Sequence, residues 1–423
     1  MSQVIDRTAD GRVVDARKVP IWTRDFTLVC LTSLSSAMCF QFLLPTLPLY
    51  IKSLGGRETE IGLSLATYSI AALASRMIAG RALDVFGRKV PLVIGALLFF
   101  IATPMYTMVT AIVPFMLLRT FHGLGFGIVG TGSSALAADL APAKRRGEAL
   151  GYFGNANSVA MAVGSAIAVS LMAIEGLPLN GFQLVFVACT LVAMVELVSA
   201  LSIHEAPRPA GSRAASTNWS LASFLCPAAI PIAFAMLFGA VTSGATMSFV
   251  PVYLAATSPQ IVPIFFLVYA IVMTVSRPFV GRLIDRIDRR IVVIPLLAIC
   301  SVGVSILAIA PTVQVAVASA IVFGLGFGSL NPTLLALVVD RVKPWERGTA
   351  LATFTASMDI GIASGSAVFG IVAQNYGFHA VFLGAGAVCA LGILYFGAVY
   401  RRLAPHKHVA PGLSAGASPL AAE

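Results

Sequence analysis

Among the ionisable residues inside long apolar stretches of the sequence, where a charge is costly, four are candidates for chemistry: Arg119, His122, Glu196 and Asp359. A charged side chain at the centre of a membrane helix costs about 2.5 to 3.5 kcal/mol on insertion scales, so such residues usually face a cavity or a partner. Burial penalises an ionised carboxylate, which makes Asp359 our first choice for a proton carrier. His122, with an ordinary pKa of about 6.5, is a further proton acceptor, and Glu196 ranks below both.

Arg119 lies three residues before His122, so the two side chains share one face of a helix. A buried guanidinium can hold an anionic substrate group or keep a nearby carboxylate ionised until a proton arrives. Each of these residues also has a structural explanation. Arg119 can pair with a neighbouring helix, His122 can hydrogen-bond to another helix, and Asp359 can bond to backbone or serine at a kink flanked by glycines.

The elements that position these residues are apolar runs of about twenty residues, the length that crosses a hydrocarbon core. Of the 423 residues, 58% are hydrophobic and 11% are charged, which is far less charge than a soluble domain carries. A membrane β-barrel would instead show alternating segments of about ten residues. We predict twelve membrane helices, over residues 26–50, 59–80, 90–111, 113–140, 148–174, 182–203, 227–254, 260–281, 291–311, 314–340, 347–373 and 378–400.

The net charge of +10 follows the loops rather than a solvated domain, which disfavours binding to nucleic acid. Most Lys and Arg residues fall in alternate loops and in the two tails, so the positive-inside rule places both termini in the cytoplasm. We therefore expect a multi-pass protein of a bacterial-type cytoplasmic (inner) membrane, surrounded by lipid. The 6 cysteines show no metal-ligand spacing, and we expect no metal or cofactor.

The second half of the chain repeats the first at an offset of 201, the difference between positions 75 and 276. The matching residues are Ser75-Arg76 with Ser276-Arg277, Gly123-Leu-Gly-Phe-Gly127 with Gly324-Leu-Gly-Phe-Gly328, and Asp139 with Asp340. This repeat predicts two pseudo-symmetric six-helix bundles, and residues at the matched positions are expected to serve closure and packing. The predicted parts are a tail (1–25), a first half (26–203), a linker (204–226), a second half (227–400) and a tail (401–423).

Two motifs resemble signatures of the major facilitator superfamily. The segment Gly80-Arg-Ala-Leu-Asp84-Val-Phe-Gly87-Arg88-Lys89 resembles its loop motif between helices two and three, and a weaker copy begins at Gly281. Arg119-Thr-Phe-His122-Gly123 resembles the helix-four motif of the drug:proton antiporter branch, with histidine in place of the usual glutamine. The resemblance implies the major facilitator fold and a monomeric secondary carrier, not an enzyme, in which the halves rock around a central cavity.

The resemblance also implies roles for residues of the loops and the cavity. In that family the loop arginine pairs with the acid that ends helix four, and this suggests a gate, although a charge cluster that only fixes topology is the alternative. The predicted gate residues are Asp84, Arg88, Asp139, Asp285, Arg289 and Asp340. The predicted cavity residues are Gln41, Asn155, Thr246 and Asn331.

These features favour a transporter that exports a small amphipathic compound in exchange for protons. The antiporter branch usually carries Gly-Pro in helix five, whereas this chain has Gly164-Ser165. An uptake symporter or facilitator of a small organic anion, metabolite or sugar, with Arg119 as the anion partner, is therefore the alternative. The sequence holds neither a His-Glu-x-x-His pair nor a nucleotide-binding P-loop, which disfavours an enzyme or a primary pump.

Overall fold

A computed structural model describes residues 5–7, 13–15, 20–142, 145–174, 176, 178–205, 225–284, 289–343 and 346–400. Two short strands, β1 (Ile5–Arg7) and β2 (Val13–Asp15), pair antiparallel ahead of the helices. The helices are α1 (Arg24–Ser53), α2 (Glu58–Phe86), α3 (Lys89–Met105), α4 (Ile112–Leu140), α5 (Arg146–Met172), α6 (Gly181–Ser202), α7 (Ile230–Ala255), α8 (Ile261–Ile284), α9 (Arg289–Ile306), α10 (Val313–Arg341) and α11 (Arg347–Tyr400).

The helix α11 is two helices joined at Gly377, whose φ of 78° is the left-handed conformation that glycine adopts readily. The described chain therefore contains the twelve predicted membrane helices, and the prediction of an all-helical membrane region is confirmed. Seven of the described helices, with α11 counted once, are long and apolar enough to span a membrane by themselves. The apolar parts of α3, α5, α8 and α9 are shorter.

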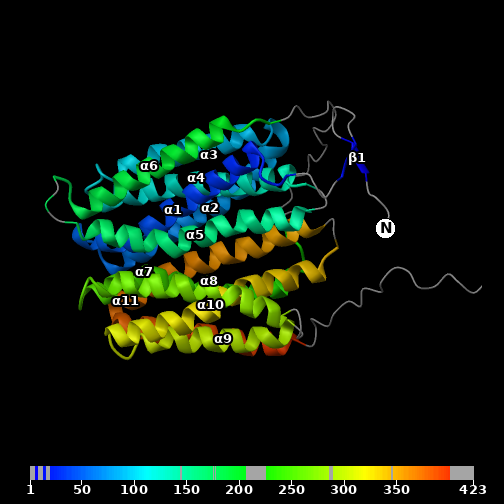
Figure 1. Cartoon of the computed structure of the whole chain (residues 1–423). Helices are drawn as coiled ribbons and strands as arrows, with labels where there is room; N and C mark the ends of the chain where they lie inside the picture. Colours follow the sequence, from blue (N-terminus) through cyan, green and yellow to red (C-terminus); the bar gives the residue numbers. More distant parts are fainter. Residues whose placement is uncertain are drawn as a thin grey trace, which may run out of the picture.

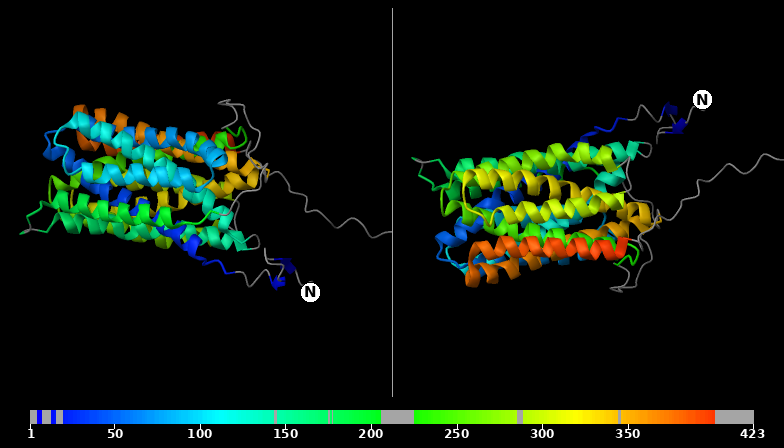
Figure 2. Two further views of the ribbon diagram at one scale, coloured as in Figure 1. Left: turned by 90° about the horizontal axis from the view of Figure 1, so that it is seen from above. Right: turned by 90° about the horizontal axis from the view of Figure 1, so that it is seen from below.

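The helices form two bundles that lie side by side, α1–α6 above and α7–α11 below in Figure 1. All helices run roughly along one direction, and α1 begins at the same end of the molecule at which α11 finishes (Figures 1 and 2). We call this end, which carries Arg24, Arg88, Arg145 and Arg341, the basic end. The opposite end, with the loops 54–57, 106–111 and 256–260, is the distal end.

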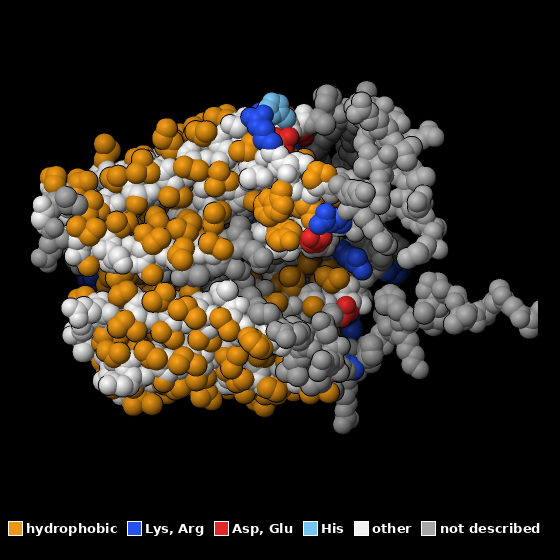
Figure 3. Space-filling view, viewed as in Figure 1, with side chains coloured by type: hydrophobic (Ala, Val, Ile, Leu, Met, Phe, Trp, Pro, Cys, Tyr) orange, Lys and Arg blue, Asp and Glu red, His pale blue; other side chains and the backbone are white. Residues whose placement is uncertain are grey.

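Hydrophobic side chains cover the flank of both bundles, whereas the charged ones visible on this face lie mainly near the basic end (Figure 3). Exposed apolar residues such as Leu117 (68%) and Leu191 (61%) have water-excluding lipid as their natural environment. Inside the bundles, glycines allow helix backbones to approach closely. A Cβ at Gly365 would lie 2.1 Å from the carbonyl oxygen of Val241, and one at Gly123 would lie 2.4 Å from that of Tyr68.

The two bundles meet along α2 with α11, α5 with α8, and α1 with α7. Near the distal end of the first seam, the Ser366 hydroxyl donates to the carbonyl oxygen of Gly62 at 2.6 Å. One turn further out, Thr59 donates to Gln374 at 2.7 Å. This α2–α11 seam carries the first of the candidate functional contacts.

Candidate functional site: an ion pair and a cavity between the two bundles

An ion pair joins the two bundles near the middle of the α2–α11 seam. Nε of Arg76 in α2 lies 3.3 Å from Oδ2 of Asp359 in α11, and the side chains are 26% and 13% exposed. The Arg76 guanidinium also lies 5.7 Å from the ring centroid of Phe126 in α4. Because each charge comes from a different bundle, the attraction between them holds the bundles together in this conformation.

Sequence reasoning found Asp359 but missed Arg76. The repeat grouped Arg76 with the scaffold, since Arg277 matches it in the second half. The position of Arg76 inside an apolar span could have identified it. An unpaired arginine there is costly and therefore needs an acid or a cavity nearby. Asp359 is that acid, and its partner is Arg76 rather than Arg119.

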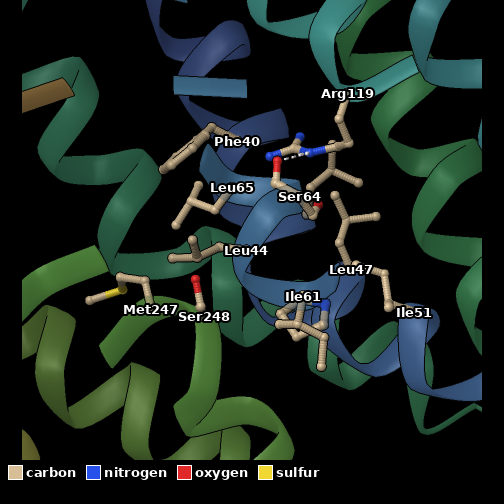
Figure 4. Close-up of a pocket in the computed structure, with 12 residues that line it drawn as sticks. Phe40, Leu44, Leu47, Ile51, Ile61, Ser64, Leu65, Arg119, Met247 and Ser248 are labelled. Atoms are coloured by element: carbon tan, nitrogen blue, oxygen red, sulfur yellow. Dashed lines mark hydrogen bonds between the residues drawn. The ribbon is translucent and has the colours of Figure 1, made fainter. Parts of the chain in front are cut away.

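Arg119 projects from α4 into a small cavity that we call the Arg119 cavity. The cavity has a volume of about 20 Å³, room for about one water molecule. Nε of Arg119 donates to the carbonyl oxygen of Ser64 (Figure 4), over a distance of 3.3 Å. Its guanidinium lies 4.1 Å from the ring centroid of Tyr68. The lining is otherwise mostly apolar and comes from both bundles: Phe40, Leu43, Leu44, Leu47, Pro48, Ile51, Ile61, Leu65, Met247 and Ser248.

No carboxylate pairs with Arg119 among the described residues. The side chain is 4% exposed, its Nε donates to the Ser64 carbonyl, and its guanidinium lies over the Tyr68 ring. A buried guanidinium with only neutral partners is electrostatically suited to an anionic group.

His122 points away from the Arg119 cavity into the core of the first bundle. Its Nδ1 lies 3.1 Å from the Tyr106 hydroxyl, and its ring makes edge contacts with Phe99 and Tyr68. The ring is fully buried, and Nε2 has no hydrogen-bond partner among the described residues. The structure thus does not bring His122 together with Asp359, and its part in proton transfer stays a prediction.

Glu196 lies on α6 and is also fully buried in the first bundle. Neither carboxyl oxygen has a hydrogen-bond partner among the described residues. Burying a carboxyl group without a hydrogen-bond partner costs free energy. Glu196 makes no ion pair with Arg119 in the part of the chain that the structure describes.

At the basic end, Nε of Arg88 donates to Oδ2 of Asp139 at 3.0 Å. This is the contact between the loop arginine and the end of helix four that the family resemblance implied. The carboxylate of Glu205, just after α6, accepts the backbone N–H groups of Arg88 and Lys89 at 2.7 and 2.9 Å. Glu205 therefore caps the start of α3, where a negative charge also interacts favourably with the helix dipole. Sequence reasoning missed Glu205 because it lies in the linker.

Other predicted gate residues are less fully described. Asp340 is exposed at the end of α10. The side chains of Asp84 and Arg289 and the whole of Asp285 lie outside the described residues. The gating role of this group stays a prediction.

The predicted cavity residues that the structure describes form hydrogen bonds within the protein. Gln41 is buried, its carbonyl accepts the Ser165 hydroxyl at 3.2 Å, and Thr246 donates to the Thr242 carbonyl within α7 at 2.8 Å. Asn331 bonds to the Met358 sulfur at 2.8 Å. The side chain of Asn155 lies outside the described residues. Contact with a substrate remains a prediction for all four.

Comparison with known proteins identifies this architecture. The sequence profile of the Major Facilitator Superfamily matches residues 29–258 and 232–422. The chain belongs to the major facilitator superfamily. It is therefore a multi-pass membrane transporter for small molecules and not an enzyme, as the sequence motifs predicted.

Several characterised and uncharacterised members of this superfamily are similar along nearly their whole length. The multidrug resistance protein MdtG of Proteus mirabilis is 26% identical over 393 residues, which are 88% of this chain and 95% of that protein. An uncharacterized MFS-type transporter of Methanocaldococcus jannaschii is 23% identical over 366 residues, 84% of this chain and 94% of that protein.

Solved structures agree on the fold. The crystal structure of the nucleoside transporter NupG has a TM-score of 0.69 at 18% identity and covers 89% of this chain and 99% of that chain. The D-xylose-proton symporter has a TM-score of 0.71 at 18% identity, with 88% of this chain and 96% of that chain covered. At this level of identity the likeness establishes the fold alone.

Proposed function

We propose that this superfamily member exports a small amphipathic compound in exchange for protons. The observation that carries the proposal is the Arg76–Asp359 ion pair, because it lets one proton change how the two bundles are held together. When Asp359 is ionised, it attracts Arg76 across the seam. When Asp359 binds a proton, that attraction is lost and the bundles are freer to separate, which couples protonation to alternating access.

The direction of transport is the second part of the proposal. Similarity to the MdtG multidrug resistance proteins supports export, and the mostly apolar lining of the Arg119 cavity supports an amphipathic substrate. We further propose that the basic end faces the cytoplasm of a bacterial-type cell, in keeping with the positive-inside rule.

Proteoliposomes with an imposed pH gradient test the coupling. A panel of amphipathic dyes and of small organic anions is loaded on one side, and their movement is followed with the gradient in either direction. We expect wild-type protein to move at least one dye against its gradient at the expense of the proton gradient, and Asp359→Asn to lose that accumulation. If the transport rate does not depend on the pH gradient and is unchanged in Asp359→Asn, the hypothesis of proton coupling is wrong.

A specific observation also favours a second candidate function, uptake of a small organic anion. Arg119 lines a cavity between the bundles without a carboxylate partner among the described residues, and this is the arrangement that an anionic substrate group would complete. In the same vesicles, uptake of an anion that is abolished by Arg119→Ala and partly retained by Arg119→Lys supports this candidate. Accumulation of dyes without any anion transport rejects it.

A further inference from the structure

A second and larger cavity, of about 960 Å³, lies at the distal end; we call it the distal cavity. From the first bundle it is lined by the ends of α1 and α5, the start of α6 and the loop between α3 and α4. From the second bundle it is lined by the junction of α7 and α8. Its residues are Leu49, Tyr50, Ser53, Leu54, Thr107, Thr110, Val169, Ser170, Met172, Ala173, Asn180, Gly181, Phe182, Gln183, Phe186, Ala255, Pro259, Gln260, Val262 and Pro263.

None of these lining residues carries a charge, and most of their polar groups are already bonded within the protein. The Tyr50 hydroxyl donates to the Val109 carbonyl at 2.6 Å, and the Ser53 hydroxyl donates to the Tyr50 carbonyl at 2.7 Å. Asn180 and Gln183 accept each other's backbone N–H groups in a capping box at the start of α6. The interior therefore offers dispersion contacts rather than hydrogen bonds, which suits an apolar chain.

A lateral recess of about 380 Å³ along the α5–α8 seam adjoins the distal cavity. Ser170 lines both spaces, and the remaining residues of the recess are Val163, Ala166, Ile167, Leu171, Ile174 and Leu267. Ile167, Ile174 and Leu267 are 41%, 43% and 42% exposed on the apolar flank of the molecule. Ser170 is exposed where the two spaces adjoin, so the shortest route for a lipid chain from the flank to the distal cavity passes this residue.

The rim and the floor of the distal cavity differ in polarity. Among the lining residues, the polar Ser53, Asn180 and Gln260 are exposed and form the rim, whereas the apolar Val169 and Phe186 are buried and form the floor. A molecule with a polar head and an apolar chain matches this change from a polar rim to an apolar floor.

The distal cavity is separate from the Arg119 cavity. The end of α1 forms a wall between them, because Leu47 and Ile51 line the Arg119 cavity while Leu49, Tyr50 and Ser53 line the distal cavity. A molecule in the distal cavity therefore contacts both bundles. It also contacts α1 on the face opposite to the one that lines the Arg119 cavity.

We propose that the distal cavity is a binding site for a membrane phospholipid of the leaflet at the distal end. One acyl chain enters along the α5–α8 seam and lies on Phe186 and Val169, and the headgroup remains at the rim. The bound chain fills a space shared by the two bundles and so stabilises the conformation in which they enclose it. This site is independent of the direction of transport and of proton coupling.

Fluorescence quenching by brominated lipid tests the proposal in the full chain. All variants carry Trp22, Trp219 and Trp345 replaced by Phe, so that one introduced tryptophan reports alone. Phe182→Trp places the reporter in the distal cavity, and Leu191→Trp, at a position 61% exposed on the same helix, places a control reporter in ordinary lipid. The protein is reconstituted in phosphatidylcholine vesicles with and without bromine on one acyl chain.

We expect brominated lipid to quench both reporters. Adding Ser170→Phe blocks the passage between recess and cavity, and it should abolish most quenching of the Phe182→Trp reporter while leaving the Leu191→Trp reporter unchanged. Ala173→Leu is a second blocking variant, in case Ser170→Phe does not elute as a folded monodisperse protein. A Phe182→Trp reporter that brominated lipid does not quench, or that is quenched equally with the passage blocked, overturns the proposal.

Discussion

Removing either charge of the Arg76–Asp359 pair should shift the protein towards the conformation in which the bundles separate at the distal end. Arg76→Gln and Asp359→Asn keep the size of each side chain and remove its charge. Towards the distal end, the same seam carries the hydrogen bonds from Ser366 to Gly62 and from Thr59 to Gln374. Losing the attraction at the centre of the seam should therefore weaken the contact between α2 and α11 along its length.

The expected magnitude follows from the geometry of the pair. Two unit charges 3.3 Å apart attract by roughly 5 kcal/mol at an effective dielectric constant of about 20. Taking both charges out of water offsets much of this attraction. We therefore expect a net coupling of about 1 to 3 kcal/mol, which is usual for residues in direct contact. Such a coupling changes a conformational equilibrium by about 5- to 150-fold.

The assay measures how often Ser64 becomes accessible. Ser64 is 4% exposed and lines the Arg119 cavity near the distal end, and Ser64→Cys can be labelled by a membrane-impermeant maleimide when that end opens. The native cysteines are all buried and give a low background. Either charge-removing variant should raise the labelling rate by about 5- to 150-fold, and the double variant should raise it no further, because the interaction is already lost.

A matched control removes a different ion pair. Lys52 and Glu58 pair within the first bundle, so Glu58→Gln should leave the labelling of Ser64→Cys unchanged. If Arg76→Gln and Asp359→Asn also leave it unchanged, or if their effects simply add in the double variant, the pair does not hold the bundles together and the coupling mechanism is wrong.

Three further predictions concern stability. Gly365→Ala should lower the free energy of unfolding by about 1 to 3 kcal/mol, because its Cβ meets the backbone of α7 at 2.1 Å, whereas Gly130→Ala, with nothing within 4 Å, should be neutral; equal melting temperatures would contradict this. Glu205→Ala removes the cap of α3 and should cost about 0.5 to 2 kcal/mol, with faster hydrogen exchange at the first amides of that helix as the local readout. Glu196→Met replaces an unpartnered buried carboxyl group with an apolar chain and should raise the melting temperature; a lower value would mean that Glu196 has a stabilising role.

The sequence by itself determined the number of membrane helices, the division into two bundles and the family. These features depend on local hydrophobicity and on a repeat, and both are readable without knowing which helices touch. The contact between Arg88 and Asp139 was also predictable, because the motif that contains Arg88 resembles one whose partner in helix four is known.

Only the tertiary structure decided which intramembrane charges meet. The sequence placed Arg119, His122 and Asp359 in apolar spans, but spacing along one helix says nothing about the face that a distant helix presents to it. Packing set Asp359 against Arg76, turned His122 into the first bundle and left Arg119 with neutral partners among the described residues. The distal cavity has the same origin, since it exists only where the ends of five helices and the loops next to them, from both bundles, converge.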